Sequence, residues 1–554
     1  MHIAVVGCGH GEIDKIYEVV EEIEKRREIK VSLVICCGDF QSVRNMTDLR
    51  CMACPIKYQQ MHDFHRYYSG EKKAPILTLF IGGNHEASNF LQELPYGGWV
   101  APNIFYMGYV GVFKFGPVRI AGISGIYKGQ DYLKGRYESP PYDQGTMRSV
   151  YHYRNLDIFR LKQLKEPVDI ILSHDWPKGI HQFGDTYQLL RRKPFFRDEI
   201  ERNELGSRPL FEVLEKVQPK FWFSAHMHVK FPAHVTHPDE VKNDEHLRAD
   251  LETQQEPKIT KFLALDKVLP RRQFLQVIEI PTPVVAETPS TVLEYDTEWL
   301  AILKSTNHLL SVKQKPGFMP GPGGNSRFDF TPSVEEITEI FSIFQDNFSV
   351  PDNFCETGST YQNGDIPKTA FPTENPQTRE FCHKLGVTDP LQDIIDSNLK
   401  NPLLDKAADQ SFGYSDYSSL IPSQLDISMN RTSIFDDSIN PNPDEIALDD
   451  DEDAGDLPAR DVESTTKKQD SVCRSKLVLP PPKSSTSKPE DTDAKDGDTE
   501  GETTGASAEE LQLLRSVMGE PDTESESGTN LFFLDTGGGE PHTKRRKDLG
   551  SFKY

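Results

Sequence analysis

The sequence predicts an α/β protein in which strands and helices alternate. Short apolar runs rich in β-branched and aromatic residues recur through the first half of the chain and are bounded by glycine, as buried strands are. Between the first two runs, residues 12–27 repeat apolar side chains at helical spacing, which predicts a crossover helix between neighbouring strands. Polar residues follow the runs at once, and open sheets with helical crossovers place their sites at these carboxyl ends.

Five predicted strands support this reading in chain order. They cover residues 3–6, 31–37, 76–81, 168–172 and 221–223. The polar residues after them are, in the same order, Cys8 and His10, Asp39, Asn84 and His85, His174, and His226 with His228. We therefore expect these eight side chains to meet at one edge of the structure.

The residue types are those of a two-metal hydrolase of phosphate esters. Two divalent ions about 3.5–4 Å apart can clamp a phosphoryl group and activate a water molecule. Asp39 is the only carboxylate in the set, and its two oxygens allow it to bridge two ions. Imidazoles suit zinc, iron and manganese, and Asn84 offers a carbonyl oxygen. Because side chains of adjacent residues diverge, His85 is expected to act as a proton donor rather than as a ligand.

Each element alone has a structural alternative. Residues 82–85 could be an ordinary turn, and Cys8 could be a small buried hydrophobic residue. His226 and His228, if they lie on a strand, point to one face and could be a surface pair. The occurrence of all of them in order, each after a predicted strand, favours the functional interpretation.

These motifs resemble known families. Asp39, residues 82–86, His174 and the pair His226 and His228 resemble the calcineurin-like metallophosphoesterase superfamily. That superfamily usually begins with Asp-x-His, and the variant Cys8-Gly9-His10 resembles the RNA lariat debranching enzymes. Residues 38–45, 67–75 and 93–99 resemble the same family. The likeness is strong over about the first 240 residues and weaker to about residue 400.

The resemblance implies a metallophosphoesterase β-sandwich flanked by helices, with two metal pockets. One pocket would be formed by Cys8, His10, Asp39 and His228. The other would be formed by Asp39, Asn84, His174 and His226. The preferred metals of that family include iron, zinc and manganese, so the two ions per chain would be Fe(II), Zn(II) or Mn(II); a soft sulfur ligand favours zinc or iron over magnesium in its pocket. A cysteine ligand at position 8 would also expose the site to oxidation.

The implied function is hydrolysis of the 2′-5′ phosphodiester at the branch point of excised intron lariat RNA. In that family a metal-held hydroxide attacks and His85 would protonate the departing 2′ oxygen, after which the linear intron is degraded or processed into small RNAs. Expected partners are branched lariat RNA and splicing or spliceosome-disassembly factors. A phosphatase or DNA nuclease of the same superfamily predicts Asp at position 8, and a non-catalytic scaffold predicts lost ligands.

Residues 119–165 are locally basic, with nine Lys or Arg and four Asp or Glu. Aromatic faces stack unpaired bases and cations hold phosphates. The debranching family has a lariat-recognition loop in this region, matching residues 124–154; the alternative is an ordinary loop. The expected RNA contacts are Tyr127, Lys128, Tyr132, Lys134, Arg136, Arg148 and Arg154.

Composition divides the 554 residues into three parts. We expect a catalytic domain over residues 1–255, a smaller C-terminal domain over 256–400, and a disordered acidic tail over 401–554. Residues 431–554 hold 29 acidic and 15 basic residues, so the net charge of −24 does not argue against an RNA substrate. The basic run 544–547 predicts nuclear import, with shuttling to the cytoplasm left open. No long apolar span is present, so no membrane partner is expected.

Overall fold

The computed structural model describes residues 1–238, 257–281 and 292–399. The predicted acidic tail and the basic run 544–547 lie outside the described residues. Within them, no helix has both the length and the apolar character that crossing a membrane requires.

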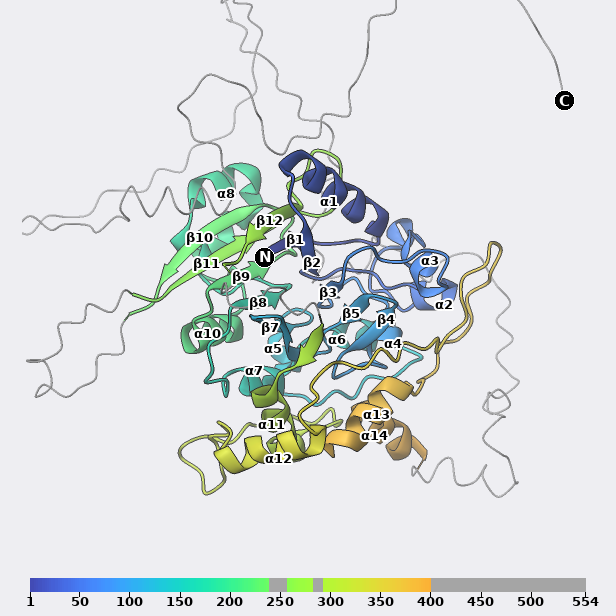
Figure 1. Ribbon diagram of the computed structural model, residues 1–554, viewed down its shortest axis with the longest axis vertical. Helices are drawn as coiled ribbons and strands as arrows, with labels where there is room; N and C mark the ends of the chain where they lie inside the picture. Colours follow the sequence, from blue (N-terminus) through green and yellow to red (C-terminus); the bar gives the residue numbers. More distant parts are fainter. Residues whose placement is uncertain (239–256, 282–291, 400–554) are drawn as a thin grey trace, which may run out of the picture. The chain divides into compact units, whose positions relative to one another are not determined.

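Two mixed sheets form the centre of the fold (Figure 1). The first has the order β12 (Leu275–Glu279), β1 (His2–Val6), β2 (Val31–Cys36), β3 (Thr78–Phe80), β5 (Ile104–Tyr106) and β4 (Gly98–Ala101). In this sheet β1, β2, β3 and β5 run parallel, and the two edge strands are antiparallel to their neighbours.

The second sheet has seven strands. Its order is β10 (Phe231–Thr236), β11 (Ile259–Ala264), β9 (Phe221–Ser224), β8 (Ile170–Ser173), β7 (Val118–Ile123), β6 (Val110–Phe115) and β13 (Leu293–Tyr295). Strands β7, β8, β9 and β11 are parallel. Both sheets therefore contain a parallel group whose carboxyl ends can supply one shared site.

The alternation of side chains along β1 shows how the layers pack. Ile3 and Val5 belong to the apolar core that includes residues of both sheets, whereas Ala4 and Val6 belong to the core beneath the helices. Successive side chains of a strand point to opposite faces, so a strand buried on both sides is apolar throughout. The predicted α/β sandwich flanked by helices is confirmed.

The helices cover these sheets and their connections. In chain order they are α1 (Ile13–Arg27), α2 (Met46–Leu49), α3 (Phe64–Tyr68), α4 (Ser88–Leu91), α5 (Gly129–Tyr132), α6 (Gln144–Ser149), α7 (Asn155–Leu161), α8 (Thr186–Arg192), α9 (Arg197–Glu201), α10 (Arg208–Val217), α11 (Thr297–Ser305), α12 (Val334–Phe344), α13 (Pro376–Leu385) and α14 (Pro390–Leu399). Short 3-10 helices lie at Ile56–Tyr58, Ile180–Phe183, Pro194–Phe196 and Asn307–Leu309.

The sandwich does not end at the predicted boundary after residue 255. β11 joins the second sheet, and β12 pairs antiparallel with β1 at the edge of the first. The run 274–280, which we expected in the smaller domain, thus lies in the sandwich because β1 needs a neighbour on its open side. The helices α11 to α14 follow and gather at one end of the sheets (Figure 1).

Polar contacts tie the segment after α12 back to the sandwich. The guanidinium of Arg44 is buried and donates to Asp48, to Glu93 at 2.9 Å and to Thr357 Oγ1 at 2.9 Å. Tyr68 Oη donates to the carbonyl of Gly358 at 3.0 Å. Because a buried charge is stable only when paired, this arrangement fixes residues near 357 against α2 and α4.

Candidate metal centre and its recognition loop

All eight candidate side chains lie just beyond strand ends, and the two sheets contribute them jointly. Cys8 and His10 follow β1, Asp39 follows β2, and Asn84 and His85 follow β3. From the second sheet, His174 follows β8, and His226 and His228 follow β9. The loops are joined directly, because Gly9 N donates to Gly38 O at 3.2 Å and Ala225 N donates to His174 O at 3.1 Å.

The backbone is strained where the ligand candidates lie. His10, Asp39, His226 and His228 have φ of 46°, 46°, 62° and 48°. Non-glycine residues seldom adopt this left-handed conformation, which costs about 1–3 kcal/mol each and concentrates at functional sites. His226 and His228 follow the strand as predicted, so the alternative of a pair on the strand does not apply: β9 ends at Ser224, and a turn orients the two rings.

Four residues form the first cluster. The candidate ligand atoms of Cys8, His10, Asp39 and His228 all lie within 4.8 Å of one another. The Nε2 atoms of His10 and His228 are 3.3 Å apart, and His10 Nε2 is 3.8 Å from Asp39 Oδ2. Asp39 Oδ2 is buried and has no hydrogen-bond partner among the described residues. An unpaired buried carboxylate oxygen facing two imidazole nitrogens fits a metal cation.

The other oxygen of Asp39 faces the second cluster. His174 Nε2 is 3.4 Å from Asp39 Oδ1 and 3.1 Å from Asn84 Oδ1, and the rings of His174 and His226 have centroids 4.9 Å apart. His174 Nδ1 lies 2.8 Å from the carbonyl of Cys37. A backbone carbonyl at Nδ1 holds the proton there and leaves Nε2 for a metal. Asp39 is thus the one residue shared by both clusters.

Glycine is required where these loops touch. A Cβ at Gly83 would collide with Asp39 Oδ1, and one at Gly38, where φ is 106°, would collide with the imidazole of His174. Both positions let backbone approach the candidate ligands closely.

The electrostatics favour the metal-binding forms of His10, His228 and Asp39. Burial lowers the pKa of His10 to about 3, and burial with the neighbouring His10 holds the pKa of His228 well below its usual range. Both rings are therefore neutral at neutral pH, as ligands must be. Burial alone would raise the pKa of Asp39, but His174 and His85 hold it well below its usual range.

Cys8 differs from the other candidates. It is fully buried, and its sulfur accepts a hydrogen bond from the backbone N–H of His226 at 3.2 Å. Burial and the nearby Asp39 raise the pKa of the Cys8 thiol well above its usual range. A metal cation beside the sulfur would reverse this, because a metal lowers the pKa of a coordinating thiol.

His85 lies beside the clusters but takes a different position from Asn84. Its backbone N–H donates to Asp39 Oδ1 at 2.8 Å, and its ring centroid is 6.0 Å from that of His10. Its Nδ1 has no hydrogen-bond partner among the described residues. The ring therefore borders the proposed metal pockets without any contact that fixes it as a ligand.

The sequence analysis assigned no role to Glu86, which holds the loops together. Its carboxylate accepts hydrogen bonds from the backbone N–H groups of Phe40 and Gln41 at 2.8 Å and of Gly83 at 3.0 Å. Burial and the charge of Asp39 raise the pKa of Glu86 to about 8. Its place in the run 82–86 was visible in the sequence, but its partners Phe40 and Gln41, which lie 46 and 45 residues away, were not.

The predicted recognition loop begins at the metal centre. Ser124 Oγ accepts from Gly82 N at 2.9 Å, Gly125 N donates to Gly82 O at 2.8 Å, and Tyr127 N donates to the Asp175 carboxylate at 3.4 Å. Tyr127 and Tyr132 are partly exposed and lie edge to face, with ring centroids 5.4 Å apart. The loop is thus placed next to the turn that carries Asn84 and His85.

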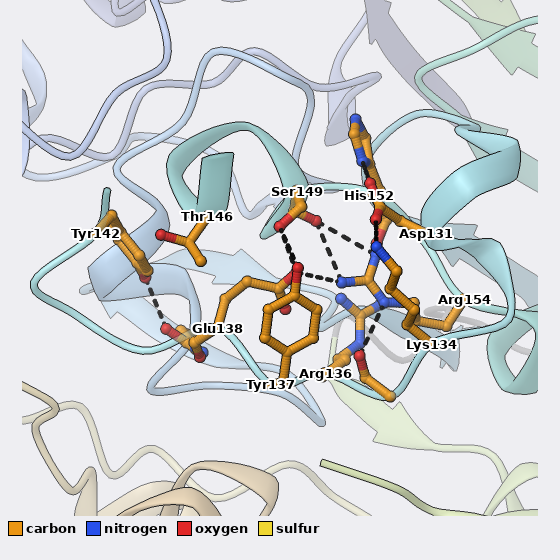
Figure 2. A network of polar contacts seen from close by, with 12 residues as sticks. Asp131, Lys134, Arg136, Tyr137, Glu138, Tyr142, Thr146, Ser149, His152 and Arg154 are labelled. Carbon is orange, nitrogen blue, oxygen red and sulfur yellow. Dashed lines mark hydrogen bonds and ion pairs between the residues drawn. The ribbon is translucent and has the colours of Figure 1, made fainter. Parts of the chain in front are cut away.

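Two of the predicted phosphate contacts are structural instead (Figure 2). Arg136 is 7% exposed and pairs with Asp157 at 2.6 Å, and Arg154 is 2% exposed and pairs with Glu138 at 2.6 Å. Lys134 also has an acidic partner, Asp131 at 2.7 Å. The prediction that Arg136 and Arg154 hold RNA phosphates is wrong, because their guanidinium groups already neutralise buried carboxylates. Lys128, Lys134 and Arg148 remain partly exposed.

Two family models match successive parts of the chain. Residues 1–230 match the family model of calcineurin-like phosphoesterases, and residues 257–390 match that of the lariat debranching enzyme, C-terminal domain. Lariat debranching enzyme A of Xenopus laevis is 49% identical over 464 residues, which cover 82% of each chain.

The chain belongs to the lariat debranching enzyme family. The Homo sapiens lariat debranching enzyme is 48% identical, with 82% of this chain and 80% of that one covered. The Arabidopsis thaliana lariat debranching enzyme is 44% identical over 70% of this chain and 86% of its own. The resemblance inferred from Cys8-Gly9-His10 is confirmed, as is the prediction of a hydrolase of the phosphoesterase class. The calcineurin-like phosphoesterases are metal-dependent, and the cluster around Asp39 fits that property.

Proposed function

We propose that this protein hydrolyses the 2′-5′ phosphodiester at the branch point of intron lariat RNA. The observation that carries the proposal is the complete donor set around Asp39, including Cys8, in a chain of the lariat debranching enzyme family. A linear intron with an ordinary 2′-OH would be the product, ready for degradation or for processing into small RNAs.

Two divalent ions would occupy the two clusters. Cys8, His10, Asp39 and His228 would hold one, and Asp39, Asn84, His174 and His226 the other. When bound, the ions would activate a water molecule and neutralise charge on the phosphate oxygens. Fe(II), Zn(II) or Mn(II) would be the ions: sulfur and imidazole donors favour Fe(II) or Zn(II), and the oxygens of Asp39 and Asn84 also suit Mn(II).

The protein's own groups would complete the reaction. His85 would donate a proton to the departing 2′ oxygen, because its ring lies beside that of His10 while its backbone N–H is held on Asp39. Glu86 would keep the loop after β2 and the turn after β3 in register. Tyr127, Tyr132, Lys128, Lys134 and Arg148 would contact the branched RNA from the recognition loop.

The decisive test compares two substrates of the same sequence. Purified full-length protein with a divalent metal is incubated with a branched RNA and with its linear 3′-5′ isomer. We expect cleavage of the branch linkage and little cleavage of the linear strand. Equal cleavage of both linkages, or activity on phosphoproteins alone, would overturn the assignment.

The cellular setting is a separate part of the proposal. A debranching activity acts on introns after splicing, so we place the protein in the nucleus, with splicing or spliceosome-disassembly factors as partners. The support is the basic run 544–547 of the sequence, which has the composition of an import signal.

A further inference from the structure

A second cavity lies between the recognition loop and the C-terminal part of the chain. It has a volume of about 330 Å³, and none of the candidate metal ligands lines it. One wall comes from residues 133–136 and from the start of α7, and the other from residues 308–311 and 317–319. Cavities of about 300–1,000 Å³ are typical of small-ligand sites.

Backbone hydrogen bonds join the two walls and define the shape of the cavity. Arg136 N donates to Ser311 O at 2.9 Å, Gly135 N to Lys313 O at 2.8 Å, and Gly317 N to Leu133 O at 2.8 Å. Asn155 Nδ2 donates to Gly317 O at 2.8 Å. The segment 311–317 is thus fastened along the loop at several points, and the cavity is a built feature of the fold.

Arg160 of α7 lines this cavity and is unlike the other arginines there. It is only 4% exposed, its Nε donates to Thr306 Oγ1 at 2.9 Å, and its Nη2 is buried with no hydrogen-bond partner among the described residues. Arg136 and Arg154 line the same cavity, but each has a carboxylate partner. Figure 1 shows α7 next to α11, the helix that precedes Thr306.

Among the described residues no carboxylate forms an ion pair or a hydrogen bond with Arg160, although the charge of nearby Asp157 acts on it. Asp157 is the one carboxylate that lines the cavity, and it already binds Arg136 at 2.6 Å and the backbone N–H of Arg154 at 2.8 Å. Burial lowers the pKa of Arg160, yet a guanidinium stays protonated in proteins. A buried guanidinium without an ion-pair partner destabilises the protein. An anion bound in the cavity would supply that partner.

We propose that this cavity binds the phosphate group of a small molecule, at a site separate from the metal centre. A guanidinium presents a planar fork of N–H donors that matches two phosphate oxygens. His308 in the opposite wall and the rings of Tyr96 and Tyr109 also line the cavity, and they offer aromatic surface to a nucleoside attached to that phosphate. The inference does not depend on which phosphodiester the metal centre cleaves.

The cavity shares two lining residues with a smaller cavity beside the turn that carries Asn84 and His85. Tyr109 and Arg136 line both this cavity and a smaller one of about 30 Å³, whose wall includes Gly82, Gly83 and Glu86.

The test must separate this site from phosphate binding at the metals. Calorimetric titration of the full-length protein uses inorganic phosphate, adenosine 5′-monophosphate and, as the phosphate-free control, adenosine; the wild type and the arginine variants are loaded with metal, whereas Asp39→Asn is used as the form that loses it. Each is titrated into the wild type, Asp39→Asn, Arg160→Gln and Arg191→Gln. Asp39→Asn removes phosphate binding at the metal centre, and Arg191→Gln removes one exposed positive charge elsewhere.

We expect phosphate binding to persist in Asp39→Asn and Arg191→Gln and to weaken about 10- to 100-fold at the second site in Arg160→Gln, as expected for loss of charged hydrogen bonds. Adenosine should not bind. Tighter binding of the nucleotide would identify a mononucleotide as the ligand, and equal binding would identify inorganic phosphate. Binding that survives Arg160→Gln, or that vanishes in Asp39→Asn, would overturn the proposal.

Two further measurements guard against misfolded variants. Arg160→Met removes an unpaired charge, so the ligand-free protein should melt no lower than the wild type, whereas its phosphate-dependent shift in melting temperature should disappear. Hydrogen exchange of the wild type should slow on ligand addition at residues 133–136 and 311–317. A strongly destabilised Arg160→Met, or protection confined to the loops around Asp39, would contradict the assignment.

Discussion

Asp39 faces two clusters with its two carboxylate oxygens, and this makes it the most informative residue to change. Asp39→Asn keeps an acceptor for the N–H of His85 but removes the negative charge that both pockets share. We expect metal content measured by mass spectrometry to fall toward zero at both pockets, with activity lost. A variant that retains two ions per chain would show that Asp39 does not bridge them.

His85 should behave in the opposite way. Its ring lacks a described contact that would make it a ligand, so His85→Ala should retain wild-type metal content. Loss of a general acid should reduce the turnover of branched RNA by about 10²–10⁴-fold. His383→Ala, on the exposed face of α13, serves as the control. Metal-free His85→Ala protein would rule out the role as a pure acid.

The residues of the site could be found from the sequence because each follows an apolar run. Carboxyl ends of parallel strands in one sheet meet at one edge, which brings Asp39 close to Asn84. That His174, from the other sheet, joins them was implied by the family resemblance. The orientation of His226 and His228 could not be found, because it depends on two left-handed residues in a turn. Glu86 was missed as well, since backbone N–H groups as partners leave no mark in the sequence.

Among the loop residues, Tyr127 combines partial exposure with a position next to the metal centre. Stacking of a base on an aromatic ring contributes about 1–3 kcal/mol. Tyr127→Ala should therefore weaken branched-RNA binding by about 5- to 150-fold at unchanged metal content, and Tyr127→Phe should keep most of the affinity. The exposed Tyr187 on α8 provides a matched control for Tyr127→Ala. Equal losses from Tyr127→Ala and Tyr187→Ala would contradict a specific contact.

Arg154 should matter for folding of the same loop rather than for contact with RNA. Arg154→Ala leaves the carboxylate of Glu138 buried without its cation, and such a loss costs about 3–5 kcal/mol. Denaturant unfolding should show this cost, whereas Arg191→Ala should change stability little because the side chain of Arg191 on α8 is exposed. An Arg154→Ala protein as stable as the wild type would refute the structural role.

At the level of elements, apolar runs located strands well but did not give their partners. The apolar run 274–280 falls in the stretch expected to form the smaller domain, and nothing local shows that it pairs with residues 2–6. The positive charge of the recognition loop suggested RNA contacts at buried arginines for a similar reason. A basic residue at the surface and one buried on a carboxylate look identical until the distant acid, such as Asp157 for Arg136, is known.

For the whole molecule, the predicted tail can be tested by deletion. Removing residues 401–554 takes away none of the candidate ligands and none of the described elements, so debranching in vitro should stay close to that of the full chain. Nuclear accumulation in cells, followed by fluorescence imaging, should fall because residues 544–547 are lost. A truncated protein that remains nuclear would exclude the import role, and an inactive one would place part of the site in the tail.

The pairing of β12 with β1 has a consequence for synthesis on the ribosome. The loop of Cys8 is held by later residues, since Gly7 N donates to Phe274 O at 2.9 Å and Val268 N donates to Cys8 O at 3.0 Å. Contacts so distant in sequence form late, because the intervening chain must first be made and closed. A nascent chain that already contains every candidate ligand up to His228 therefore still lacks residues 268–274, which hold the loop of Cys8 in place. Metal capture by this enzyme should begin only after residues near 280 have emerged, and ribosome-bound chains stopped before that point should remain inactive.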